Sequence, residues 1–342
     1  MENNSINQTT NNMESMSNNQ TTNNMENNSN NQTTNNMENN SNNQTTNNME
    51  TLSNQTTNIM ETKSHKSKQF SSAHPGLIVY VVDQSGSMSE FYPEGGTKAK
   101  FAQLAVSSAI NNIITANGAG ETIKDRAFIS IIGFGKSVQN IRSGKLSEFA
   151  NNPYRIETVI KKQSDGNGGF VEVEEQYPVY FDPVADGLTP LAEALGNVKL
   201  LFQGFMEKYP ESPYPVAMIV TDGMPRSEGV DDAVEEANAI AVANEIKAMG
   251  GLILPCHMGD GKNRCVLPNS DDQLNSKQAV FTSKIASKGK DLSQEQKDAA
   301  RKMELGNITN ETIIMAIDAG PTTLTDFLNF GSSGAMQDKM SN

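Results

Sequence analysis

The sequence is poor in several residue types that specialised protein classes need. It has no tryptophan, two cysteines and three histidines among 342 residues, and aromatic side chains make up only 6%. Two cysteines, Cys256 and Cys265, exclude a framework of several disulfides. No apolar run approaches the roughly 18 residues of a membrane span, and none follows Met1 as a secretory signal would. These absences predict a cytoplasmic protein with free thiols and no membrane contact.

Basic residues are also scarce relative to acidic ones. The chain holds 27 Lys and Arg against 40 Asp and Glu, a formal net charge of −13. Beyond residue 70 the balance is 24 basic against 34 acidic residues. Proteins that bind phosphate backbones need clustered Lys and Arg. We therefore expect no nucleic-acid partner.

The first seventy residues are built from a repeat. The twelve-residue unit MENNSNNQTTNN stands at 25–36 and again at 37–48. Its Asn, Thr, Ser and Gln side chains bury too little apolar surface to offset the entropy lost on ordering. The sequence predicts a disordered tail over 1–70 and one folded domain over 71–342. Asn/Gln-rich segments also self-associate as β-structure, which leaves an assembly role for the tail as an alternative.

Strand and helix signals alternate from residue 74 onward. Continuous apolar runs such as GLIVYVV are typical of strands covered on both faces, and apolar residues at helical spacing follow most of them. Thr189 and Pro190 are expected at the N-cap and first position of one helix. The predicted strands are 76–82, 127–133, 216–220, 251–255 and 312–317, and the predicted helices 97–116, 189–205, 231–249 and 324–330.

This order of elements predicts an α/β fold, a doubly wound and mostly parallel sheet with helices on both faces. Ligands of such sheets bind outside the carboxyl ends of the strands, at the topological switch point. Asp83 and Asp222 each end an apolar strand, so the two acids are expected to meet at that edge.

Two segments are harder to place. Residues 171–181, VEVEEQYPVYF, suit a hairpin or an edge strand, and the Asp-Gly-Asn-Gly run at 165–168 suits a hairpin turn better than a calcium loop. Residues 259–310 are polar, with one expected helix.

Oxygen donors gather at the ends of the predicted strands. Three segments carry them, namely DQSGS at 83–87, GLTP at 187–190 and TDG at 221–223. Gly86 is expected to let the first loop curl so that its two serines face one point. Magnesium prefers such hard oxygen ligands and needs few full charges. The segments predict a site for Mg²⁺, with Mn²⁺ or Ca²⁺ as substitutes, made of Asp83, Ser85, Ser87, Thr189 and Asp222.

These three motifs, in this order, resemble the von Willebrand factor A domain with its metal-ion-dependent adhesion site, over about residues 74–335. The resemblance implies that Ser85 and Ser87 ligate the metal, that Thr189 joins directly or through water, and that Asp83 and Asp222 act mostly through waters and hydrogen bonds. It also implies that an Asp or Glu of a protein partner completes the coordination. The function implied is metal-dependent protein recognition, not enzymatic catalysis.

The chain also resembles stand-alone cytoplasmic members of this family from bacterial operons for tellurium resistance and stress. Two departures from the family stand out. The loop at 91–96, between the serines and the first helix, is long, and so is the segment 136–186. Both lie where they can shape the choice of partner.

A metal-assisted hydrolase or phosphoryl-transfer protein is the alternative from another class. A serine nucleophile at Ser85 or Ser87 needs a histidine base, and only His257 lies at a predicted strand end that reaches the same edge. A zinc site at Cys256, His257 and Cys265 lacks a fourth ligand and the usual short Cys spacing. The absence of a general base and of a phosphate-binding loop favours recognition.

Overall fold

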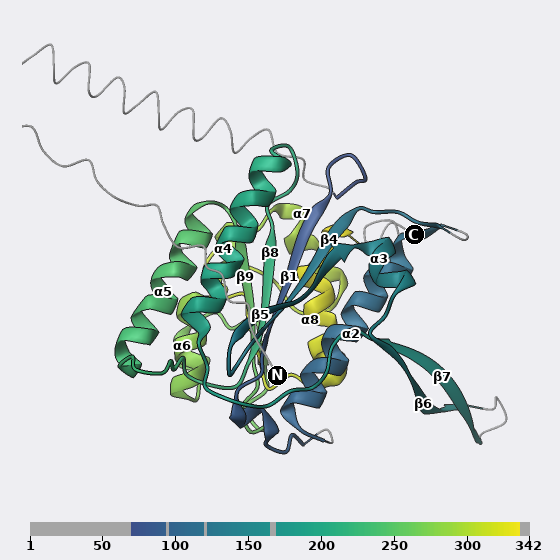
Figure 1. Ribbon diagram of the computed structural model, residues 1–342, viewed down its shortest axis with the longest axis horizontal. Coiled ribbons are helices and arrows are strands. Elements are labelled where there is room, and N and C mark those ends of the chain that lie inside the picture. Colours follow the sequence, from purple (N-terminus) through teal and green to yellow (C-terminus); the bar gives the residue numbers. More distant parts are fainter. Residues whose placement is uncertain (1–69, 94–95, 120–121, 165–168, 336–342) are drawn as a thin grey trace, which may run out of the picture. The chain divides into compact units, whose positions relative to one another are not determined.

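The computed structural model describes residues 70–93, 96–119, 122–164 and 169–335 (Figure 1). The predicted tail at 1–70 and the predicted turn at 165–168 therefore lie outside the described residues, apart from residue 70. Among the described residues, no helix is long and apolar enough to cross a bilayer.

A seven-stranded sheet forms the centre, in the order β10-β11-β9-β8-β1-β4-β5. Neighbours pair in parallel from β11 to β4, and β10 and β5 pair antiparallel at the two edges. The mostly parallel sheet is thus confirmed. The strands are β1 (Gly76–Asp83), β4 (Ala127–Phe134), β5 (Val138–Lys145), β8 (Val216–Thr221), β9 (Leu252–His257), β10 (Cys265–Val266) and β11 (Ala316–Ile317).

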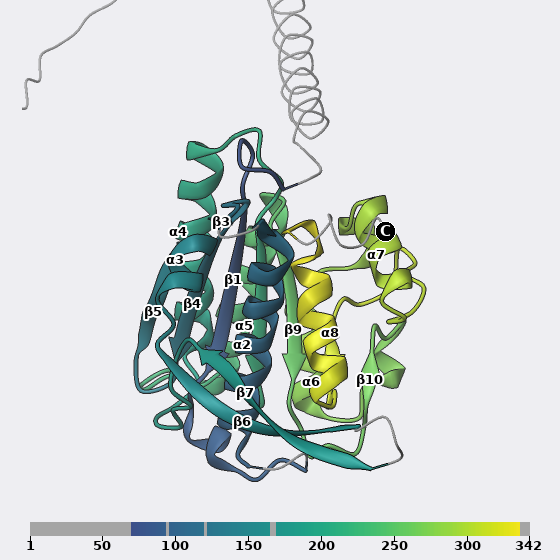
Figure 2. The same ribbon diagram turned by 90° about the vertical axis from the view of Figure 1, so that its right-hand side faces the viewer.

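Helices cover both faces of this sheet, as predicted. α2 (Lys98–Asn117) and α8 (Pro321–Gly331) lie side by side on one face, as Figure 2 shows. α4 (Leu191–Lys208), α5 (Asp232–Ala248) and α6 (Lys277–Ile285) cover the other face (Figure 1). The remaining α-helices of the described part are α3 (Leu146–Asn151) and α7 (Gln294–Lys302).

The apolar run of β1 is explained by these two layers. Val79 and Val81 belong to the core beneath α4 and α5, whereas Ile78 and Tyr80 belong to the core beneath α2 and α8. Successive side chains of a strand point to opposite faces, so a strand between two helix layers needs apolar residues at every position.

Several predicted elements need correction. The polar segment 259–310 holds two helices, α6 and α7, where one was expected. The strand predicted at 312–317 is only the two-residue β11. The edge strand β5 was not predicted, because half of its residues are polar and exposed and its pairing with β4 is broken by an irregularity at Ile131/Ile132.

A two-stranded hairpin, β6 (Arg155–Ser164) and β7 (Phe170–Val179), stands apart from the main sheet (Figure 1). Of the two forms predicted for this segment, the hairpin is therefore correct. Its base is fastened to α2, where Lys100 Nζ lies 2.9 Å from Glu157 Oε2 and the Tyr177 hydroxyl donates to the Leu104 carbonyl at 2.8 Å. A short pair, β2 (Gly118–Ala119) and β3 (Thr122–Ile123), follows α2.

Candidate metal centre

Asp83 ends β1 with its side chain fully buried. Its Oδ1 accepts a hydrogen bond from the Ser85 backbone N–H at 2.8 Å, and its Oδ2 accepts one from the Thr221 hydroxyl at 2.6 Å. The first bond bends the chain just after the strand, and the second ties this loop to the end of β8. Asp83 therefore holds this loop and the end of β8 together, and its buried side chain does not face solvent.

Three oxygen donors converge in front of Asp83. The hydroxyl oxygens of Ser85 and Ser87 lie 3.1 Å apart, and the Ser87 hydroxyl donates to Asp222 Oδ1 at 2.7 Å. Ser85 and Asp222 are buried, whereas Ser87 is exposed, so the cluster opens to solvent on the Ser87 side. The structure thus brings together residues 135 positions apart in the sequence, as the parallel sheet predicts.

Thr189 reaches the same place from a third loop. Its backbone N–H and carbonyl exchange two hydrogen bonds with Arg226, at 3.0 and 2.9 Å, which joins the loop before α4 to the loop after β8. A Cβ at Gly223 would lie 3.6 Å from the Thr189 hydroxyl oxygen, so that hydroxyl stands beside the loop of Asp222. All five predicted residues therefore lie at the end of β1 or in loops that meet at one edge of the sheet.

The predicted N-cap role of Thr189 is wrong by one position. α4 begins at Leu191, with Pro190 in the cap position and no side-chain cap. The fixed ring of Pro190 leaves Thr189 outside the helix, in the short bridge to Arg226. Its hydroxyl is therefore not used to cap α4.

Gly187, rather than Gly86, is the glycine that the site requires. Gly86 is not in the left-handed region, and a Cβ there would make an ordinary 3.6 Å contact, so the expectation about Gly86 was wrong. Gly187 has a φ of +91°, and a Cβ there would come within 2.3 Å of the Lys136 backbone nitrogen. The Gly187 carbonyl also accepts a hydrogen bond from the Gly86 N–H at 3.0 Å. Only glycine fits this close approach of two loops.

Burial decides the electrostatics of the cluster. It raises the pKa of Asp83 to about 6, although the hydrogen bonds from Ser85 and Thr221 oppose this rise. The charged form of a buried acid is destabilised because it loses its hydration. A cation beside Asp83 would offset that loss, so the buried acid favours the binding of a cation at the cluster.

Lys98, which sequence reasoning missed, already supplies one positive charge. Its ammonium lies 2.8 Å from Asp222 Oδ2 and 2.8 Å from Glu90 Oε2, and its side chain is only 8% exposed. Burial has the largest effect on the pKa of Lys98 and lowers it, but the hydrogen bonds and charges of Asp222 and Glu90 outweigh it and the pKa is raised. One signal was available in the sequence, since a lysine at the first position of a helix opposes the helix dipole.

The donor set fits a small divalent cation. An octahedron with metal–oxygen distances of about 2.1 Å places neighbouring oxygens about 3.0 Å apart. The oxygens of Ser85 and Ser87, 3.1 Å apart, have this spacing. Within the ranges that the structure describes, no three His, Cys, Asp or Glu side chains are placed for one ion, Cys256, His257 and Cys265 included. A hydroxyl-rich set with two acids suits Mg²⁺ or Mn²⁺.

A cavity of about 460 Å³ opens beside the cluster, with Ser87, Lys98 and Asp222 in its wall. His257, at the end of β9, also lines it and is 4% exposed. Its Nδ1 has no hydrogen-bond partner within the described part of the chain, and burial lowers its pKa. The predicted approach of His257 to this edge is confirmed. The Ser87 hydroxyl nevertheless donates to Asp222 and not to the imidazole.

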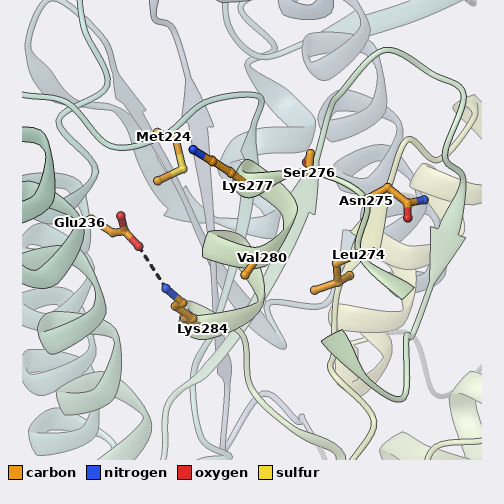
Figure 3. Close-up of a pocket in the computed structure, with 8 residues that line it drawn as sticks. All are labelled: Met224, Glu236, Leu274, Asn275, Ser276, Lys277, Val280 and Lys284. Carbon is orange, nitrogen blue, oxygen red and sulfur yellow. Dashed lines mark hydrogen bonds and ion pairs between the residues drawn. The ribbon is translucent and has the colours of Figure 1, made fainter. Parts of the chain in front are cut away.

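A second cavity, of about 410 Å³, lies along α6 (Figure 3). Glu236 of α5 pairs with Lys284 of α6 at 3.2 Å in its wall, and Val280 of α6 and Leu274 also line it. The two cavities share Asn275 and Ser276 in their walls. The surface beside the metal centre is thus hollowed as far as α5.

No family model and no curated protein matches the chain. Among solved structures, it is similar to manganese-loaded TRAP of Plasmodium vivax, at 17% identity and a TM-score of 0.31 over 56% of this chain and 59% of that one. It is also similar to the pilus adhesin SpaC of Lactobacillus rhamnosus GG, at 15% identity and a TM-score of 0.46 over 80% and 32% of the two chains.

A third similar structure is the vWF domain of the type V pili tip protein Mfa5 of Porphyromonas gingivalis, at 10% identity and a TM-score of 0.39 over 76% and 95%. The chain thus spans 59% of the TRAP chain and 32% of the SpaC chain. All three similarities are remote.

Proposed function

We propose that the chain is a von Willebrand factor A domain that recognises a protein partner through a bound Mg²⁺ ion. The observation that supports this most directly is the Ser85–Ser87–Asp222 cluster, with hydroxyl oxygens 3.1 Å apart and Asp222 Oδ1 2.7 Å from Ser87. Such a cluster, open on the exposed Ser87 side, suits an ion that keeps a position for an outside ligand.

In this proposal Ser85, Ser87 and Thr189 hold the ion. Asp83 and Asp222 fix the hydroxyls and supply the negative charge. The bound ion supplies a Lewis-acidic position for a carboxylate, which is the hard oxygen ligand that a protein surface offers most readily. The partner is therefore a protein with an accessible Asp or Glu, and no bond is made or broken.

Mg²⁺ alone tests the metal centre. We expect it to raise the melting temperature of the wild type, since an ion at about 100 times its Kd adds about 2.7 kcal/mol of stability. Ser87→Ala should lose most of this shift. Ser89→Ala is the matched control, because Ser89 lies in the same turn and its exposed hydroxyl donates only to the Gly86 carbonyl, at 2.7 Å.

A Ser87→Ala protein with the full Mg²⁺ shift would contradict the proposed centre. Partner recognition is tested by capture from a native lysate in Mg²⁺ and in EDTA. A protein captured only in Mg²⁺, and lost with Ser87→Ala, supports recognition through the ion, whereas capture that is equal in EDTA overturns it.

The hydrolase alternative is supported by one observation, the place of His257 in the cavity wall. An imidazole here is a candidate general base, but its Nδ1 is itself buried, which disfavours this role. Divalent-dependent turnover of a phosphate or ester substrate, lost in His257→Ala, would favour an enzyme. We propose the absence of such turnover.

Location in the cytoplasm and kinship with the tellurium-resistance members of the family are further parts of the proposal. Both cysteines of the chain are free thiols, Cys256 buried and Cys265 partly buried, which suits a reducing compartment. Fractionation of the source cells, with the protein absent from the soluble fraction, would contradict this location.

A further inference from the structure

The long loop at 91–96 is closed at its base and thereby positions Lys98 beside the metal centre. Its two ends are closed against each other, since the Lys98 N–H donates to the Glu90 carbonyl and the Tyr92 N–H to the Gly96 carbonyl, each at 3.0 Å. Tyr92 is fully buried and packs against Phe101 of α2, with ring centroids 4.7 Å apart. The closed loop fixes where α2 begins, and so fixes the position of Lys98.

Lys98 holds the oxygen of Asp222 that Ser87 leaves unused. Asp222 Oδ1 accepts from Ser87 at 2.7 Å, while Oδ2 accepts from the Lys98 ammonium at 2.8 Å. The Asp222 side chain is 1% exposed and that of Lys98 8%, so solvent screens this pair little. Glu90, whose side chain is 65% exposed, holds the ammonium from the outer side.

This pair changes the charge of the centre. Asp83 and Asp222 carry two negative charges when ionised, and Lys98 reduces their sum to one. A divalent ion then leaves the buried groups with a net positive charge instead of neutral. Glu90 adds a negative charge on the outer side, which solvent screens because its side chain is 65% exposed. Such a site binds its ion less tightly, because Lys98 repels the cation. It attracts an outside carboxylate more strongly, because the loaded site is positive.

We propose that Lys98 is a built-in counter-cation of the metal centre, which holds Asp222 in place without an ion, lowers the affinity for Mg²⁺ and leaves the loaded centre positive towards an acidic partner. This inference rests on the proposed function. Lys98 is a positioning and affinity-setting residue, since it acts on the ion through Asp222.

Titration of the full chain with Mg²⁺ alone, by calorimetry, tests the role of Lys98. Lys98→Met should bind Mg²⁺ about tenfold more tightly than the wild type, because a nearby positive charge is gone. In EDTA the same variant should melt at least about 5 °C lower, since buried Asp222 loses its partner. A merely structural role would lower the melting temperature without tightening Mg²⁺ binding.

Lys100→Met is the matched control. It removes the same charge from the same helix, but Lys100 pairs with Glu157 of the hairpin and is 33% exposed. It should bind Mg²⁺ as the wild type does. Lys98→Arg, which keeps the charge, should also keep the wild-type affinity. If Lys98→Met does not fold in EDTA, Lys98→Gln carries the test, because its amide can still donate to Asp222.

The outcomes separate the two proposals. A wild type that binds no Mg²⁺ overturns the metal centre and the role of Lys98 with it. A wild type that binds Mg²⁺, with equal or weaker binding by Lys98→Met and Lys98→Gln, overturns the role of Lys98 alone. Equal tightening in Lys100→Met also overturns it, since the effect would then be one of overall charge.

Discussion

The polar edge of the sheet has two halves, which hold buried acids in different ways. At the ends of β1 and β8, Asp83 and Asp222 accept hydrogen bonds from the hydroxyls of Thr221 and Ser87. Just after β11, Asp318 is equally buried but accepts from the backbone N–H groups of Gly259 and Asn263, at 2.5 and 3.4 Å.

Hydroxyl donors distinguish the first half, in which Asp83 also accepts from the backbone N–H of Ser85. A hydroxyl that donates to an acid still has lone pairs on its oxygen, which can bind a cation, whereas a backbone N–H has none. The β1–β8 half therefore presents ligand oxygens, and the half around Asp318 presents a carboxylate already satisfied by the main chain. In this molecule, hydroxyl oxygens beside the buried acids distinguish the proposed metal site from the surroundings of Asp318.

The largest expected effect on Mg²⁺ binding is at Asp83, in the half of the edge formed by β1 and β8. Asp83→Ala removes the acceptor that bends the loop at Ser85 and ties it to Thr221, so we expect the Mg²⁺-induced rise in melting temperature to disappear. Calorimetric titration of the same protein should show no heat of Mg²⁺ binding. A variant that folds and keeps its Mg²⁺ affinity would remove Asp83 from the site.

A smaller effect is expected at Gly187, which connects two loops of the same half. Gly187→Ala places a Cβ against the Lys136 backbone in a left-handed conformation. We expect a loss of about 2 kcal/mol or more in the free energy of unfolding, measured with urea. Weaker Mg²⁺ binding should accompany it because the loop of Thr189 moves. Gly196, on α4 with no atom near its missing Cβ, is the control.

The smallest effect on Mg²⁺ binding is expected from substitution of Asp318, in the second half of the edge. Asp318→Ala should destabilise the fold by about 2 kcal/mol, since two backbone N–H groups lose a charged acceptor. Mg²⁺ binding should stay at the wild-type level. Asp318→Asn should cost less, because Asn tolerates the φ of +46° found here. Loss of Mg²⁺ binding in Asp318→Ala would break the distinction between the two halves.

The sequence allowed the sheet and the first half of its edge to be predicted because both depend on local patterns. Val79 to Val82 report burial on both faces, and Asp83 and Asp222 follow directly from the ends of such runs. The structure brings the five predicted residues to one edge, and their binding of Mg²⁺ stays a prediction.

The place of Lys98 in the first turn of a helix was a signal that it needs an acidic partner, but the sequence does not indicate which acid, and Asp318 showed no such signal. Lys98 reaches Asp222 only because the loop from Glu90 closes and fixes the start of α2, and no spacing in the sequence reports that closure. Asp318 follows the two-residue β11, which is too short to show an alternation of its own. Residues whose role depends on tertiary contacts are hard to recognise from local composition.

The two antiparallel edges of the sheet bear on how the chain avoids its own copies. β10 is two residues long and offers few backbone groups to a further strand. β5 carries Arg142 and Lys145 and breaks its pairing register with β4 at Ile131/Ile132. Short, charged and irregular edges disfavour the addition of a strand from another molecule. Pairing of β10 or β5 with a strand of another copy is thereby disfavoured.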